Sequence, residues 1–275
     1  MIRQFFSRLL GKKPSVSAAW KPAWSAYLDA HVHFYAALEA RDKALFHQRV
    51  QLFLETTRIE SGYFDVTDED RLLVAASAII PVWRFPRWHY FNLTGVYLLP
   101  ATFNEQFECG QPDSLISGMV GTGPMSGKMA LSLPALRLGF SNHKDKKNVG
   151  IHEFVHLIDM ADGECDGYPE RLKEHAYAIH WFELVDVKIK EILKRKSNIR
   201  AYGATNRSEF FAVATEYFFE RPKMLERKHP ALFEVLSDFY QQDADSLTQA
   251  LLPMKNAHCH CGSRKKYKRC CMPEA

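Results

Sequence analysis

The segment His152-Glu153-Phe154-Val155-His156 places two histidines four positions apart, with a glutamate next to the first. Because an α-helix turns once per about 3.6 residues, the two imidazoles lie on one face and can converge on a single metal ion. Glu153 then lies beside the open position of that ion, where a general base can take a proton from water. The pattern therefore predicts metal-assisted hydrolysis, with zinc as the metal.

The residues around this segment are typical of a buried helix, since those at 149–151 and 157–158 are apolar. The alternative is that the two histidines are structural residues bound to carbonyl groups and match the pattern by chance. A chance match is expected on a solvated surface, so the apolar flanks favour the metal site. Gly163 can take the left-handed conformation that ends a helix. Asp159 lies one turn after His156, where its carboxylate can accept the second ring N–H of a ligating histidine or support the site less directly.

A catalytic zinc ion usually has three protein ligands and one water, so a third ligand must come from elsewhere. The eligible side chains are Glu170, Glu174, His175, His180, Glu209 and Glu216. The best setting is the apolar run at 208–216, because a carboxylate buried there needs a cation or hydrogen bonds to compensate its charge. Glu209 and Glu216 are seven residues apart and share a helix face, so spacing alone does not choose between them.

Composition sets the broad class of the protein. The chain of 275 residues, 47% of them hydrophobic, can form one large domain with a small appendage. No apolar stretch approaches the ~20 residues that cross a bilayer, and residues 1–14 lack the features of an export signal, so we expect a cytoplasmic protein without a transmembrane segment. Basic residues gather at both ends and leave an acidic body, which argues against a nucleic-acid-binding core.

Cysteines are concentrated at the end of the chain, at Cys259, Cys261, Cys270 and Cys271. Without an export signal, closely spaced cysteine pairs indicate a metal site rather than disulfides. Four thiolates can complete a closed tetrahedral zinc site that folds a segment too short to have a core. His258 and His260 are alternative ligands that rank below the cysteines. Cys109 and Cys165 are isolated, and the acidic neighbours of Cys165 favour a surface loop over a ligand.

The elements that position these residues are mainly helical. Apolar periodicity predicts two helices between residues 20 and 60, one from Thr67 to Ile80 with a capping-box start, and others over 170–195, 206–220 and, as a pair, 230–252. Strands are predicted over 95–99, 115–120 and 129–133, directly before the HExxH helix. The segment 128–133 is expected to form the sheet edge along which an extended substrate binds.

Parts of the chain also resemble a known family. The HEFVH segment, AYGATNRSEFFAV at 201–213 and EYFF at 216–219 resemble the Mlc titration factor A (MtfA) family of bacterial zinc peptidases, related to the catalytic domain of anthrax lethal factor. The resemblance implies an α+β, zincin-type peptidase domain and makes Glu209 the third ligand. It also implies that Tyr202 assists the transition state, that Glu216 supports the ligands from outside, and that substrates are of the aminopeptidase type.

The tail resembles a second known module. CHCGS at 259–263 and KKYKRCC at 265–271 resemble the SEC-C motif found at the end of the SecA translocation ATPase, apart from Arg264, where the motif usually has glycine. Such tails generally act as docking modules for a protein or ribosomal surface. We therefore expect three parts: a flexible basic segment at 1–19, the peptidase domain at 20–252, and the zinc-binding tail at 253–275.

These observations predict a zinc-dependent peptidase that holds one catalytic and one structural zinc ion. Zinc on His152, His156 and Glu209 would acidify a water, Glu153 would take its proton, and zinc with Tyr202 would stabilise the oxyanion. The alternative is a non-catalytic or latent protein that sequesters a transcriptional repressor of the Mlc type or docks through its tail. The intact set of residues favours the enzyme, because a pure binding protein needs no general base.

Overall fold

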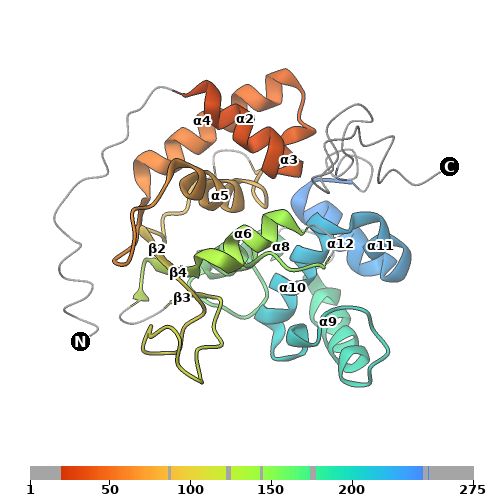
Figure 1. The fold of residues 1–275 in the computed structure, drawn as a ribbon. Helices are drawn as coiled ribbons and strands as arrows, with labels where there is room; N and C mark the ends of the chain where they lie inside the picture. Colours follow the sequence, from red (N-terminus) through yellow and green to blue (C-terminus); the bar gives the residue numbers. More distant parts are fainter. Residues whose placement is uncertain are drawn as a thin grey trace, which may run out of the picture.

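The computed structural model describes residues 20–85, 88–121, 125–142, 145–173, 178–243 and 247. These residues form a mainly helical fold with a small mixed sheet at one side, in agreement with the predicted α+β class (Figure 1). The helices are α2 (Pro22–His31), α3 (His33–Ala36), α4 (Ala40–Thr56), α5 (Asp68–Ile79), α6 (Leu133–Ser141), α7 (Val149–Asp159), α8 (Glu170–Lys173), α9 (Ala178–Leu193), α10 (Arg207–Glu220), α11 (Pro222–Lys228) and α12 (Pro230–Tyr240). Two 3₁₀ turns are η2 (Met160–Asp162) and η3 (Ala201–Ala204).

The sheet contains β1 (Arg58–Glu60), β2 (Gly95–Leu99), β3 (Gly118–Val120) and β4 (Lys128–Ser132), in the order β1-β2-β4-β3. β2 runs parallel to both β1 and β4, whereas β3 runs antiparallel to β4. The prediction that 128–133 forms the edge is therefore wrong. β4 is buried from Met129 onward and is paired on both sides, as a nearly continuous apolar strand should be. The edge beside it is the shorter β3.

The two faces of the sheet contact different cores, because successive side chains of a strand point to opposite sides. One face contributes Ile59, Val96, Leu98, Met129 and Leu131 to the main core shared with the helices. The other face contributes Tyr97, Leu99 and Ala130 to a smaller cluster with Phe103 and Met125. Strand β1 was not predicted from the sequence, since three residues with a single apolar side chain carry little pattern.

Helix α5 begins at the predicted capping box. Thr67 Oγ1 accepts a hydrogen bond from the Asp70 backbone N–H at 3.2 Å, and Asp70 Oδ2 accepts one from the Thr67 N–H at 3.4 Å. Arg137 of α6 donates to Asp70 Oδ1 through Nε at 2.9 Å and Nη2 at 2.7 Å. Helix α6 itself was not predicted. In the sequence it lies between β4 and α7, so the sheet does not directly precede the HExxH helix.

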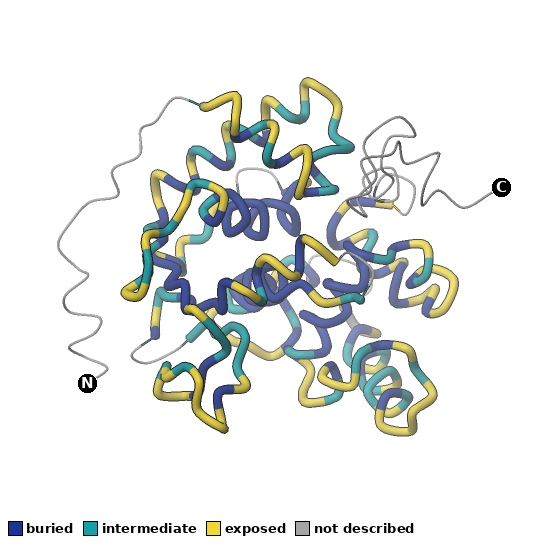
Figure 2. The backbone as a smooth tube through the Cα atoms, viewed as in Figure 1, coloured by how far each residue is buried: buried dark blue, intermediate teal, exposed yellow. Residues whose placement is uncertain are grey.

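Helix α7, which carries the HExxH segment, lies at the centre of the fold. All of its residues are buried, and it contacts α10, α5, α6 and β3. Buried residues gather in the interior of the fold, and exposed residues lie mainly on its outside (Figure 2). Asn148 caps its first turn by accepting the Ile151 N–H at 3.1 Å. The predicted stop is confirmed at Gly163, which has φ 101° and follows the turn η2. The helix was predicted to be buried, and it is buried on every side.

The C-terminal helices agree with the sequence in part. The helix predicted over 206–220 is α10, and the one predicted over 170–195 corresponds to α8 and α9, with 174–177 outside the described residues. Of the pair predicted between 230 and 252, α12 is described. The segments 1–19 and 253–275, with the four tail cysteines, lie outside the described residues. Among those that are described, no helix combines the length and apolar character that crossing a membrane requires.

Candidate metal centre

Helices α7 and α10 bring His152, His156 and Glu209 together. The Nε2 atoms of His152 and His156 are 3.2 Å apart. Glu209 Oε2 lies 3.0 Å from His152 Nε2 and 3.5 Å from His156 Nε2. Ligand atoms bonded to a tetrahedral zinc ion at about 2.0–2.1 Å lie roughly 3.3 Å from one another. The three donor atoms therefore have the chemistry and the spacing that one zinc ion requires.

Glu209 lies in the first turn of α10, whose start is fixed by Asn206. The Asn206 side chain accepts the Glu209 backbone N–H at 2.8 Å. Of the other eligible ligands, Glu170 and His180 belong to no cluster of potential metal ligands among the described residues. Glu174 and His175 lie outside the described residues.

Glu216 holds the ring of His152 from the opposite side. The His152 Nδ1 lies 2.8 Å from Glu216 Oε1, and Arg200 also donates to that oxygen. The other oxygen, Oε2, accepts the backbone N–H of Asn148 at 2.5 Å. Glu216 is only 1% exposed, so its charge depends on these donors. With the proton on Nδ1, the ring presents a free Nε2 to a metal.

A separate chain of hydrogen bonds supports His156. Its Nδ1 lies 3.0 Å from Ser208 Oγ, and Ser208 donates to Asp159 Oδ2 at 2.8 Å. Asp159 also accepts the backbone N–H of Gly167 at 2.9 Å. The sequence allowed Asp159 either to accept the ring N–H of a ligating histidine directly or to support the site less directly. In the structure the support is indirect, because the Ser208 hydroxyl lies between the Asp159 carboxylate and the His156 imidazole.

The loop after η2 comes close to this chain. Gly167 has φ 77°, and a Cβ there would lie 2.4 Å from the carbonyl oxygen of Arg207, so the close approach to α10 requires glycine. Cys165 is exposed, as predicted for a loop residue, but its Sγ lies 3.0 Å from Ser208 Oγ and 4.0 Å from His156 Nδ1. Sequence reasoning thus placed Cys165 in the right kind of segment and missed its contact with the site.

Glu153 is 5% exposed and lies beneath the edge strand β3. A Cβ on Gly118 would lie 2.6 Å from Glu153 Oε1 and 2.7 Å from its Cγ, so this glycine allows the strand to approach. Burial raises the pKa of Glu153, although His152 and His156 act in the opposite direction. A carboxylate whose proton affinity is raised in this way suits a group that takes and returns a proton.

Tyr202 lies in η3 on the solvent side of the centre. Its side chain is 52% exposed, and its hydroxyl donates to Glu209 Oε1 at 3.2 Å. Burial and the charge of Glu209 raise the pKa of Tyr202 to about 12. The phenol therefore keeps its proton at neutral pH and is available as a hydrogen-bond donor.

The ligand residues are strongly coupled in charge. Burial lowers the pKa of His152, but Glu216 and Glu209 outweigh this effect and raise it to about 9. Partial burial acts to raise the pKa of Glu209, but His152 and His156 outweigh it and hold it well below its usual range. A divalent cation that binds these side chains must displace protons from the imidazoles.

Comparison with known proteins gives matches to peptidases and to a tail motif. The model for the family described as glucose-regulated metallo-peptidase M90 matches residues 9–241, and the SEC-C motif matches residues 256–273. An uncharacterised protein of Synechocystis sp. is 31% identical over 231 residues, which cover 80% of this chain and 83% of that one.

Two relatives are similar over a shorter region. Mlc titration factor A of Serratia proteamaculans is 34% identical over 110 residues, which cover 38% of this chain and 42% of that one. Mlc titration factor A of Yersinia pestis is 34% identical over 103 residues, which cover 35% and 38%. Both alignments thus span less than half of either chain. Together these matches confirm the resemblances to the MtfA family and to the SEC-C motif.

Proposed function

The chain belongs to the glucose-regulated metallo-peptidase M90 family, and from this premise we propose that it is a zinc-dependent peptidase. The observation that carries the proposal is the convergence of His152, His156 and Glu209, whose donor atoms lie within 3.5 Å of one another. Glu153 and Tyr202 lie next to the same centre. Strand β3 lies against Glu153, and Tyr202 belongs to the turn η3, from which its hydroxyl donates to Glu209.

The protein groups divide the chemistry of peptide hydrolysis among them. A zinc ion on the three ligands would supply a water of lowered pKa and polarise the peptide carbonyl. Glu153 takes the proton of that water and later delivers it to the leaving amine. Tyr202, which keeps its proton, donates a hydrogen bond to the oxyanion that forms when water adds to the carbonyl. Glu216 and Asp159 hold the histidine rings in position, the latter through Ser208.

Strand β3 is the part of the sheet that supports an extended substrate. It forms the edge next to β4, and its first residue, Gly118, is in close contact with Glu153. A peptide added to this edge would be held by main-chain hydrogen bonds, with its scissile bond near the general base. We further propose the aminopeptidase-type preference that the MtfA resemblance implies, in which the bond nearest the amino terminus is cleaved.

The test compares wild type with Glu153→Gln and Tyr202→Phe on aminoacyl-nitroanilides and internally quenched peptides, with bound zinc measured in each. We expect about the same zinc content in all three, no turnover with Glu153→Gln, and kcat lowered roughly 10²-fold with Tyr202→Phe. Equal turnover by wild type and Glu153→Gln would contradict the assignment. Cleavage of internal peptide bonds in preference to nitroanilides would remove the aminopeptidase part alone.

A second candidate is binding of a transcriptional repressor, favoured by the relatives named for titrating Mlc. Under this proposal the body of the chain binds a repressor of the Mlc type, whether or not it hydrolyses peptides. The SEC-C match adds a proposed zinc site on Cys259, Cys261, Cys270 and Cys271 that docks on a protein or ribosomal surface.

Glu153→Gln separates these functions, because a binding surface does not need the general base. Full retention of repressor binding by this variant, with peptidase activity lost, would show that the two functions are independent. Lack of binding of an Mlc-type repressor by wild type would remove the second candidate. Co-sedimentation with ribosomes before and after deletion of 253–275 tests the docking role of the tail.

A further inference from the structure

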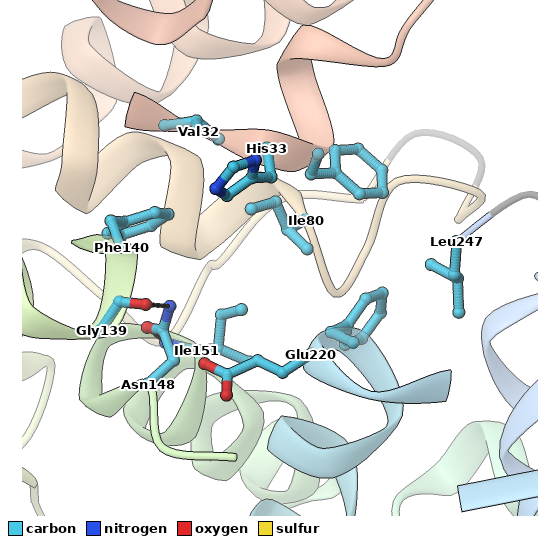
Figure 3. Close-up of a pocket in the computed structure, with 11 residues that line it drawn as sticks. Val32, His33, Ile80, Gly139, Phe140, Asn148, Ile151, Glu220 and Leu247 are labelled. Atoms are coloured by element: carbon cyan, nitrogen blue, oxygen red, sulfur yellow. Dashed lines mark hydrogen bonds between the residues drawn. The ribbon is translucent and has the colours of Figure 1, made fainter. Parts of the chain in front are cut away.

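A partly open cavity of about 50 Å³ lies behind the metal centre, at the amino-terminal end of α7. It is enclosed by the junction of α2 and α3, the end of α5, α6, the start of α7 and the end of α10 (Figure 3). Most of its lining is apolar, including the aromatic rings of Phe34, Phe140 and Phe219. A volume of this size holds a few waters or a small organic group.

One carboxylate, that of Glu220, lies in this apolar lining beside Asn148 and Ile151 (Figure 3). The residue is 5% exposed, and its Oε2 accepts the backbone N–H of Lys147 at 3.0 Å. Its Oε1 is buried and has no hydrogen-bond partner among the described residues. Since a buried acceptor without a partner is costly, this oxygen calls for a donor that the lining itself does not provide.

The charged groups around Glu220 determine which donor fits. Glu216 on the same helix and Asp145 before α7 are negative, and Arg200 is the cation that opposes them. His33 lines the cavity from α3. Burial, followed by the charges of Glu216 and Asp145, raises the pKa of Glu220 to about 9, so a bare negative charge is disfavoured there unless a proton or another cation neutralises it.

We propose that this cavity binds a small alkylammonium ion, whose N–H donates to Glu220 Oε1 and whose alkyl group packs against the aromatic lining. An ammonium group satisfies the unpartnered oxygen, and aromatic faces attract cations while accommodating their methyl groups. The ion takes the place of the proton on Glu220, so each binding event releases one proton at neutral pH. The site does not share a ligand with the metal centre and stands independently of the peptidase proposal.

The probes are methylammonium chloride and the lysine side chain of N-acetyl-lysine-methylamide, titrated calorimetrically into the full-length protein at constant ionic strength. A ligand with so few heavy atoms has an affinity ceiling near the millimolar range, so saturable binding of one ion per chain in that range is expected. Affinity should rise about tenfold per pH unit between pH 7 and 8, because the ion competes with one proton. Titration in two buffers of different ionisation enthalpy measures the proton released.

Glu220→Gln should lower the affinity about tenfold or more, while the matched control Glu234→Gln, at an exposed position of α12, should leave it unchanged. If the lysine probe binds more tightly than methylammonium, the source of the ammonium group is a lysine-bearing chain. If the two probes bind equally, the source is a free amine. Absence of saturation, the same affinity for sodium ions, or unchanged binding by a folded Glu220→Gln would overturn the proposal. If that variant fails to fold, a pH-independent affinity in wild type overturns it instead.

Discussion

The two histidines of the candidate centre are held in different ways. His152 contacts a buried carboxylate directly, whereas His156 reaches Asp159 only through the hydroxyl of Ser208. If Nε2 of His156 binds the metal, its Nδ1–H donates to Ser208 Oγ, and the Ser208 hydroxyl must then donate to Asp159. Ser208 therefore sets the direction of this chain of hydrogen bonds and fixes the tautomer of the imidazole.

We expect Ser208→Ala to weaken zinc binding about tenfold or more, because the His156 ring loses its orienting acceptor. Asp159 also loses a donor, which should lower the free energy of unfolding by about 1–3 kcal/mol. The measurements are chelator competition for zinc and thermal unfolding. The matched control is Ser237→Ala, since Ser237 Oγ is buried without a partner among the described residues. Equal effects of the two substitutions would contradict the role of Ser208.

At the residue scale, the sequence predicted the arrangement of site residues that share one helix. It missed contacts between residues that lie far apart in the chain. The spacing of His152 and His156 placed both on one face of a helix, and the shared face of Glu209 and Glu216 is also observed. These two carboxylates contact opposite nitrogens of the His152 ring, a division that helical spacing alone does not reveal. Ser208 and Arg200 were missed because their partners lie far along the chain.

At the scale of elements, β3 matters because its backbone lies against Glu153. We expect Gly118→Ala to displace this side chain, since the new methyl group would lie 2.6 Å from Glu153 Oε1. Peptidase kcat should fall roughly 10²-fold with zinc content unchanged, because a general base moved by about 1 Å is poorly placed.

A matched control for Gly118→Ala exists on β2. The Cβ of Gly95→Ala would meet only the Arg58 carbonyl oxygen, at 3.6 Å, which is an ordinary contact. Gly95→Ala should therefore keep wild-type kcat. Loss of zinc from Gly118→Ala, or a similar loss of kcat in both variants, would indicate general disruption of the sheet rather than displacement of Glu153.

The end of α10 should make stability depend on pH. The pKa of Glu220 is about 9 in the folded protein against 4.5 for the free group, so between these values the folded state binds the extra proton. The free energy of unfolding should then fall as pH rises through this range, by up to about 1.4 kcal/mol per pH unit. Glu220→Gln does not titrate, so its stability profile from denaturant unfolding should be flatter. Parallel profiles for the variant and wild type would contradict the raised pKa.

The elements that were mispredicted share a physical cause. The run 128–136 is almost continuously apolar, which is compatible with a strand alone or with a strand followed by a helix. The chain turns into α6 at Leu133-Pro134, after the Ser132 side chain accepts the Ala135 N–H at 3.4 Å. Which strand forms the edge depends on pairing between residues far apart in the chain, and no local pattern in the sequence predicts it.

At the scale of the whole molecule, the peptidase family match ends at residue 241 and the SEC-C match begins at residue 256. We propose that residues 253–275 are a separate zinc-binding module. Deletion of this segment should remove one zinc ion per chain and leave peptidase activity within about twofold. Cys261→Ser with Cys270→Ser should have the same effect on zinc content. Loss of activity in both variants would mean that the tail supports the catalytic centre.

The complete burial of α7 has a consequence for how the protein exchanges metal. A helix covered on every side opens only when much of the domain opens, so its amide hydrogens should be among the last to exchange with deuterium. Tyr202, by contrast, is exposed, and Glu209 in the first turn of α10 is partly exposed. Of the three proposed ligands, His152 and His156 thus belong to the fully buried helix α7, whereas Glu209 lies at the partly exposed side of the centre. We therefore expect a metal ion bound at this centre to leave and return while the protein stays folded.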